Sequence, residues 1–137
     1  MSIQPNECQV FIQAWVDVNA LANGQTTGCY VVSNRSSDSR GEGTPNLTVN
    51  VVNESAVCWS VVPIDPQYNG KFKITEVSTP SGWEHPPAPV PDKPNVFTGK
   101  LQKATVSGTV NCDLQFSYHG ENPITVSLPI KIVPVIK

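Results

Sequence analysis

The two histidines, His85 and His119, are the first candidates for acid–base chemistry in this sequence, because imidazole is the side chain that most often serves as a general base. Nucleophilic catalysis needs a base held against a nucleophile, and neither histidine lies in a motif that would supply such a pair. His85 falls in a proline-rich stretch, and His119 ends a predicted strand just before a turn. Neither position therefore predicts a general base.

Carboxylate pairs could catalyse glycoside hydrolysis if two acids stood on facing, rigid elements. Six of the 11 acidic residues instead fall in predicted turns, namely Glu42, Glu54, Asp65, Glu84, Asp92 and Glu121. We therefore expect no catalytic residues and no enzymatic activity.

Metal sites are weakly indicated. The four cysteines, Cys8, Cys29, Cys58 and Cys112, are separated by 21, 29 and 54 positions and contain no C-x-x-C pair, so buried, reduced thiols are the better interpretation than a zinc site. If the protein were exported, disulfides and the three N-x-S/T sequons would become relevant. The polar loop at residues 34–46 offers Asp38 and Glu42 to calcium but lacks an EF-hand pattern. We expect neither a metal nor another cofactor.

Composition limits the partners and the location. The 137-residue chain has a net charge of -2 and no basic stripe, which argues against nucleic acid and anionic membranes as partners. The polar segment Met1–Glu7 lacks the apolar core of a secretory signal, and no apolar run is long enough to span a membrane. We expect a cytoplasmic protein whose residues 1–137 form one domain.

Three strands are predicted in the centre of the chain, at Leu47–Val52, Ala56–Val62 and Gly70–Val77, and we expect them to form a meander. The middle strand is apolar on both sides and carries no charge, so it should lie inside a sheet and be covered on both faces. Its Trp59 should be buried against Phe72, Phe116 or both.

The flanking strands differ in how well they protect a sheet edge. The last, Ile124–Val133, directs Val126, Leu128, Ile130 and Ile132 inward, and two prolines mark it as an edge. The first, Val10–Val18, alternates cleanly and carries only Asp17 as a charge. Phe11 and Trp15 lie together on one side of it, so we expect this strand or its outer face to mediate self-association into a homo-oligomer, most simply a two-fold dimer.

The segment Ser78–Asn95 contains six of the 13 prolines, and it predicts a long surface loop without a strand or helix. Trp83 and His85 lie at its mouth, where the indole could stack on a sugar ring. Alternatively, Trp83 anchors the loop to the body of the protein, which we favour.

Eight strands with turn signals between them and no convincing helix predict an all-β fold, an antiparallel β-sandwich with a long proline-rich loop.

The order of motifs resembles the AidA/PixA family of bacterial inclusion body proteins. The motifs are, in order, WVDVNAL, CYVV, GEGTPNLTVNV, VCWSVVPID, YNGKFKI, SGTVNCDLQFSYHG and LPIKI. The resemblance implies a small cytoplasmic β-sandwich without established catalysis or cofactor, and it carries over no functional residues. Two functions remain open: a structural protein that self-associates, and a lectin-like module that binds a glycan through exposed aromatic residues.

Overall fold

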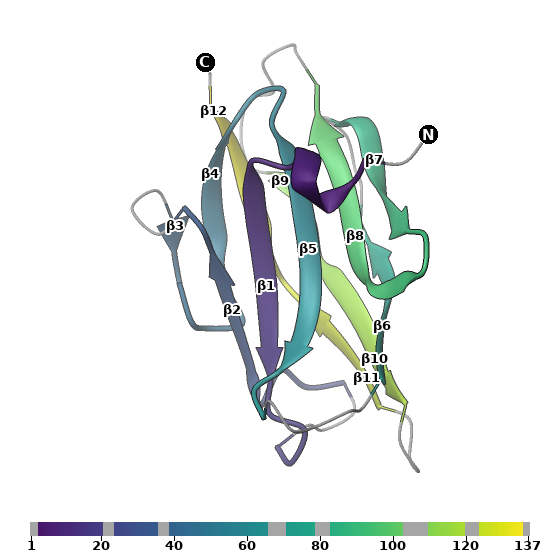
Figure 1. Ribbon diagram of the computed structural model, residues 1–137. Coiled ribbons are helices and arrows are strands. Elements are labelled where there is room, and N and C mark those ends of the chain that lie inside the picture. Colours follow the sequence, from purple (N-terminus) through teal and green to yellow (C-terminus); the bar gives the residue numbers. More distant parts are fainter. Residues whose placement is uncertain are drawn as a thin grey trace.

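The computed structural model describes residues 3–20, 24–35, 39–65, 71–78, 83–102, 110–119 and 124–135. These residues form one short 3-10 helix and twelve strands (Figure 1). The elements are η1 (Pro5–Glu7), β1 (Val10–Val16), β2 (Cys29–Ser33), β3 (Ser39–Arg40), β4 (Thr48–Val52), β5 (Ala56–Pro63), β6 (Lys71–Val77), β7 (Trp83–Val90), β8 (Lys93–Leu101), β9 (Val110–Asn111), β10 (Leu114–His119), β11 (Ile124–Leu128) and β12 (Lys131–Val135). Turns predicted at residues 107–108 and 120–123 lie outside the described residues.

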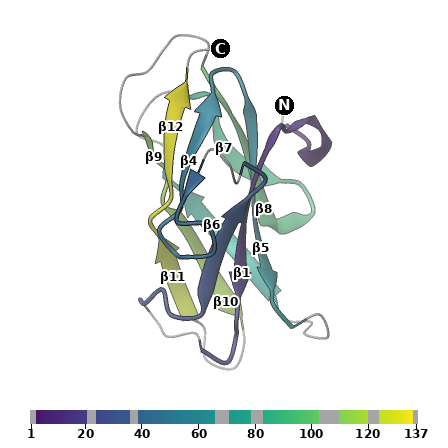
Figure 2. The ribbon, with the colours of Figure 1, turned by 90° about the vertical axis from the view of Figure 1, so that its left-hand side faces the viewer.

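The strands lie in two layers, which Figure 2 shows from the side. The first layer is one sheet with the order β2-β1-β5-β8-β7. The second consists of two sheets, β3-β4-β12-β9 and β11-β10-β6. These two sheets continue into one another, because only two residues separate β9 from β10 and β11 from β12, and the Cys112 N–H donates to the Ile130 carbonyl across the break at 2.9 Å.

The predicted all-β sandwich is confirmed, with two differences in detail. Twelve strand segments replace the expected eight, because some long strands are interrupted and β3 and β7 are additional. Two pairings are parallel, β1 with β5 and β4 with β12, so each layer is mixed rather than purely antiparallel.

The predicted central meander is wrong, although β4, β5 and β6 begin and end within one residue of their expected positions. β4 pairs with β3 and β12, β5 with β1 and β8, and β6 with β10, so the chain crosses between layers after β4 and again after β5. Glu54, with φ at 71°, lies in the first crossing. An apolar strand face can be buried beside its neighbour or opposite it, and local sequence does not distinguish these arrangements.

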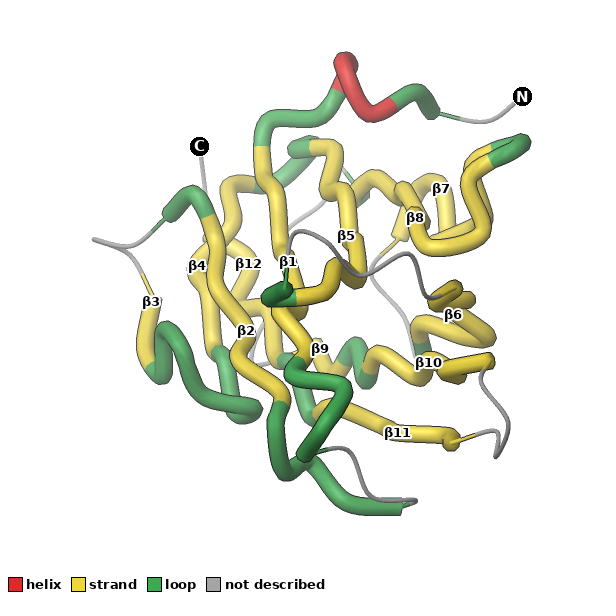
Figure 3. The backbone as a smooth tube through the Cα atoms, turned by 60° about the horizontal axis from the view of Figure 1, so that its bottom comes forward, coloured by secondary structure: helices red, strands yellow, loops and turns green. Residues whose placement is uncertain are grey.

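The central position of β5 is confirmed. Val57, Trp59 and Val61 point into the core and are fully buried, and Cys58 on the other side is only 5% exposed. The amino-terminal segment crosses that outer side, where the Ile3 carbonyl accepts a hydrogen bond from Thr98 Oγ1 on β8 at 2.7 Å. Figure 3 shows the helical turn η1 outside the layer that contains β1 and β5.

The aromatic partner of Trp59 is Trp83, whose ring centroid lies 5.5 Å away. Phe72 and Phe116, the expected partners, pack edge-on against each other at 6.0 Å within the same core. The burial of Trp59 is therefore as predicted, but its nearest aromatic contact comes from the proline-rich segment.

That segment is not a loop throughout, because its residues Trp83–Val90 form strand β7. β7 is the last strand of its layer and pairs only with β8, in a register interrupted at three points. An edge strand has one side without a sheet partner, and a proline there removes no needed hydrogen bond. The prolines thus restrict this strand to the edge instead of preventing it.

The carboxyl-terminal strand was expected at an edge, but β12 lies between β4 and β9, while β11 ends its sheet. Lys131 donates its N–H to the Leu47 carbonyl, and the Val135 carbonyl accepts the Asn53 N–H. In this parallel pair every second residue of β12 bonds to β4, and Pro134 is not one of them, so its missing N–H costs no hydrogen bond to β4. The inward orientation of Val126, Leu128, Ile130 and Ile132 is confirmed.

Candidate interaction surface

The outer side of β2, β1 and β5 carries a cross-strand row of apolar side chains. Trp15 on β1 pairs with Tyr30 on β2 and with Val62 on β5. Val10, Ile12, Ala14 and Val16 of β1 point inward, so alternation directs Trp15 and Phe11 outward. We call Phe11, Trp15, Tyr30 and Val62 the aromatic face.

The aromatic face is exposed at one end. Trp15 is 38% exposed and Tyr30 is 45% exposed, and both belong to the few large apolar side chains that reach solvent in the described part of the chain. Ile64, also 45% exposed, donates its N–H to the Val16 carbonyl and so follows directly beside this end. Three of the large exposed apolar side chains therefore lie at the same end of one sheet.

No charged residue occurs in β1, β2 or β5, whose sequences are VFIQAWV, CYVVS and AVCWSVVP. Sheet surfaces that face water normally alternate apolar with charged or polar residues. Here the outward positions between the aromatic and aliphatic side chains are uncharged, such as Gln13 and Ser60. The face combines apolar area with a low desolvation cost, as the centre of a protein interface does.

The opposite end of this surface is occupied by the chain itself. The Phe11 N–H donates to Asn34 Oδ1 at 3.0 Å, and the Asn34 amide donates to the Gln9 carbonyl at 3.1 Å. The side chain of Phe11 is only partly exposed. Of the two residues predicted for self-association, Trp15 is therefore the more accessible, and β1 is an interior strand that offers its outer side and not an edge.

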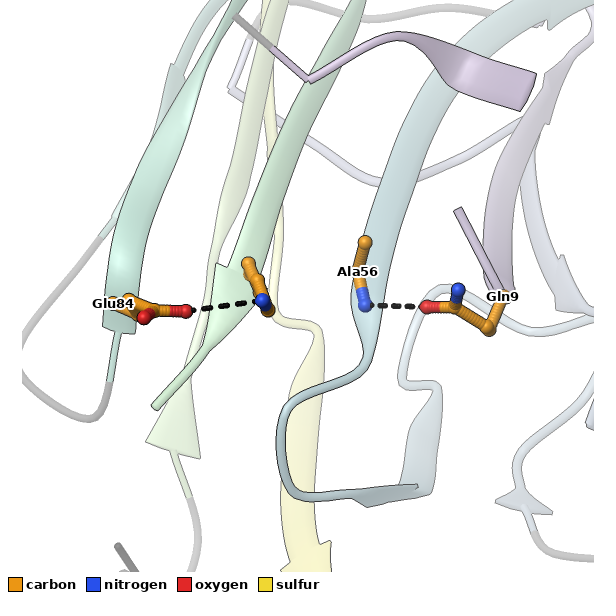
Figure 4. Close-up of polar contacts among 4 residues, drawn as sticks. Gln9, Ala56 and Glu84 are labelled. Atoms are coloured by element: carbon orange, nitrogen blue, oxygen red, sulfur yellow. Dashed lines mark hydrogen bonds and ion pairs between the residues drawn. The ribbon is translucent and has the colours of Figure 1, made fainter. Parts of the chain in front are cut away.

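A groove of about 590 Å³ opens beside the amino-terminal segment. Its lining residues are Ile3, Glu7, Gln9, Glu54, Ala56, His85 and Lys100. Gln9 Oε1 accepts the Ala56 N–H at 2.8 Å, and nearby the Lys100 amine forms an ion pair with Glu84 at 3.2 Å (Figure 4). These contacts hold the wall of the groove together, and the ion pair with Glu84 engages the amine of Lys100, the lining residue that pairs with His85.

Trp83 and His85, predicted together as a ligand site, are directed to opposite sides of their sheet. Trp83 pairs with Leu101 and His85 with Lys100, so β7 has one extra residue, Glu84, between two consecutive pairs and forms a β-bulge there. This bulge reverses the usual alternation, and Trp83 faces the core with the buried Leu101 while His85 faces solvent with Lys100. The geometry favours the alternative in which Trp83 anchors its segment.

The cysteines are unpaired, and their surroundings make them poor nucleophiles. Burial, together with the neighbouring Cys58 thiol, raises the pKa of Cys8 to about 12, and burial raises the pKa of Cys29 to about 11. Burial also raises the pKa values of Cys58 and Cys112. The thiols therefore stay protonated at neutral pH. Cys29, Cys58 and Cys112 are buried as expected, whereas Cys8 is only partly buried.

Glu42, considered as a calcium ligand, is engaged within the protein. Its carboxylate accepts hydrogen bonds from the Ser33 N–H at 2.9 Å, the Ser33 hydroxyl at 2.6 Å and the Ser39 hydroxyl at 2.7 Å. Burial alone would raise its pKa, but these hydrogen bonds outweigh burial and lower it. Asp38 lies outside the described residues, and the described residues bring no three His, Cys, Asp or Glu side chains together as a metal site.

Tyr30 is the residue that the sequence interpretation missed. Its strand alternates as Cys29, Tyr30, Val31, and the two flanking residues are buried. The period-two pattern therefore predicts an outward tyrosine, but only the pairing with β1 places it beside Trp15.

The chain is similar to a described domain family and to a solved structure. The profile of a domain of unknown function, DUF8788, matches residues 8–124. Among solved structures, the inclusion body protein PixA from Burkholderia cenocepacia J2315 matches with a TM-score of 0.64 and 11% sequence identity, over 98% of this chain and 100% of that one. Comparison with curated proteins finds no match. The expected resemblance to AidA/PixA proteins is thus confirmed, and at this identity it is a likeness of fold.

The part of the chain that the structure describes contains no helix that could span a membrane.

Proposed function

The chain belongs to the DUF8788 family, a domain of unknown function, and from this premise we propose that it is a non-enzymatic structural protein that self-associates through its aromatic face. The observation that carries the proposal is an uncharged outer sheet surface with Trp15 and Tyr30 exposed side by side. The fold likeness to an inclusion body protein supports the same role.

The aromatic face has the composition of an interface centre. Tryptophan and tyrosine dominate the binding energy of protein interfaces because they bury a large area with few rotatable bonds. A two-fold contact would place Trp15 and Tyr30 of one copy against the same pair of a second copy. The net charge of -2 opposes such a contact only weakly.

The proposal includes one sandwich domain in the bacterial cytoplasm. It includes no cofactor and no catalysis, since neither histidine lies in a motif that would supply a nucleophile and its base.

A second candidate function is glycan binding. Adjacent exposed aromatic rings provide a stacking platform for sugars, and Trp15 with Tyr30 now offers this platform instead of Trp83. A glycan array probed with purified protein distinguishes the two functions, because a reproducible hit lost in Trp15→Ala would favour the lectin-like role.

Light scattering after size exclusion, at tens of micromolar protein, tests self-association. We expect a mass above that of the monomer for the wild type and a loss of association through this face in Trp15→Lys. Val135→Lys is the matched control, because Val135 is 39% exposed and lies on β12 in the other layer. A monomeric wild type, or equal effects of both substitutions on folded protein, would reject the proposal.

A further inference from the structure

The edges of the two layers differ in how they are protected against pairing with another chain. At β2 the residues that follow the strand cover the edge: Val31 donates to the Thr44 carbonyl at 3.1 Å and accepts from Gly43 N–H at 2.7 Å. At β11 the Thr125 carbonyl accepts the Gly24 N–H at 3.0 Å. These edges therefore have backbone partners within the chain.

The edges formed by β7 and β6 lie on the opposite side of the molecule from β2 and β3 (Figure 1). β7 contains three prolines in WEHPPAPV, which have no N–H to donate to a new strand. β6, the sequence KFKITEV, pairs only with β10 among the described strands. Its seven residues thus form the longest edge without prolines or a covering backbone partner in the described part of the chain.

A groove of about 460 Å³ runs beside the free edge of β6. It is lined on one side by residues 73–77 of β6 and on the other by Pro87, Pro89, Pro94 and Phe97. The prolines offer apolar surface but no N–H groups that would pair with β6. Among the described residues no backbone hydrogen bond crosses this groove to β6, so a strand from outside would pair with the β6 edge by entering between β6 and the prolines.

The charges on β6 specify which strand would fit. Lys73 pairs with Ser117 and Glu76 with Gln115, and a bulge takes up the extra residue of β6 between them. Since Ser117 and Gln115 are two positions apart on β10, Lys73 and Glu76 lie on the same side of the sheet, and both are exposed. An antiparallel two-fold pairing centred between them sets each lysine opposite a glutamate, which stabilises cross-strand neighbours.

We propose that a second copy of this chain pairs with β6 edge to edge, with Lys73 opposite Glu76 of the second copy in two symmetric contacts. This inference rests on the proposed self-association and adds a second interface to it. The second layers of two sandwiches would then form one continuous sheet across the contact.

Two separate two-fold interfaces on one protomer have a consequence for the size of the assembly. A single two-fold contact closes at the dimer, whereas a protomer that uses the aromatic face for one neighbour and β6 for another leaves a free interface at each end. Further copies can then add at each end, so the assembly has no fixed size, as is needed for a protein that accumulates as a solid inclusion. Loss of either interface should stop growth at the dimer.

The experiment uses charge reversal on the full-length chain, with light scattering over a range of concentrations. The wild type should exceed the dimer mass as concentration rises, while Lys73→Glu and Glu76→Lys should each stop at twice the chain mass. An equimolar mixture of these two variants should restore growth, because both glutamates of the first variant then face both lysines of the second. Lys131→Glu, an exposed lysine on β12, makes the same charge change elsewhere and should leave growth unaltered.

The outcomes separate the two proposals. A wild type that dimerises through Trp15 but is unaffected by Lys73→Glu would overturn the β6 contact and leave the aromatic face in place. A Lys73→Glu variant that is folded by circular dichroism, remains large and gains nothing on mixing would also overturn it. A monomeric wild type would reject self-association itself.

Discussion

Replacing Trp59 with alanine is the most direct test of how the sandwich is held together. Trp59 lies on β5 in the centre of its layer, is fully buried, and contacts Trp83 on β7 with ring centroids 5.5 Å apart. Its removal takes away the side chain that connects the central strand to the proline-rich edge.

The expected cost follows from the buried area. A buried tryptophan removes about 150–250 Å² from water, which at about 25 cal/mol per Å² is worth about 4–6 kcal/mol. Alanine keeps a small part of that, which leaves about 3–5 kcal/mol, the range found for such substitutions in cores. The indole Nε1 is buried and has only the Cys112 sulfur, a weak acceptor, as a hydrogen-bonding neighbour, so its removal relieves part of a desolvation cost of about 1 kcal/mol. We therefore expect a loss near the lower end, about 3 kcal/mol.

The assay is urea denaturation followed by far-UV circular dichroism, with the slope checked for constancy. Trp15→Ala is the matched control at a concentration where the protein does not associate, because Trp15 is 38% exposed and its removal leaves no enclosed cavity. It should cost about 1–2 kcal/mol. A midpoint shift for Trp59→Ala no larger than that of Trp15→Ala would refute the assignment of Trp59 to the packed centre.

Two predictions concern pH and can be measured by the same denaturation assay, and a third concerns thiol reactivity. Burial raises the pKa of Cys29 from 9.0 to about 11, so its contribution to stability is complete below pH 9.0 and is lost as pH rises toward 11; Cys29→Ala should flatten the alkaline fall in stability, and an unchanged slope would contradict this. Cys112, fully buried, should be the slowest thiol to react with an alkylating reagent in the folded protein. Hydrogen bonds from Ser33 and Ser39 lower the pKa of Glu42 below 4.5, so its contribution is present above pH 4.5 and is lost below it. Glu42→Gln should cost about 1 kcal/mol at neutral pH and progressively less in acid, whereas a pH-independent difference would show that the carboxylate charge is unimportant.

Strand positions and strand faces were predictable because they depend on local alternation. In β1 the inward residues Val10, Ile12, Ala14 and Val16 are those that the period-two pattern selects. In β5 the absence of charge on either side correctly indicated a central strand covered on both faces. The exposure of Trp15 follows from the same rule, so half of the aromatic face was available from sequence.

Strand partners depend on contacts between residues far apart in the chain, and these the tertiary structure alone decided. β4, β5 and β6 have the expected bounds, yet they alternate between layers, since an apolar face is buried equally well beside or opposite its neighbour. A bulge between Trp83 and His85 then separated two residues that alternation would place together. Trp15 and Tyr30 became neighbours only when β1 paired with β2, and β6 became an open edge only when the other edges were covered or blocked. Hydrophobic patterning thus determined what each strand buries, while long-range hydrogen bonding determined which surfaces remain for a partner.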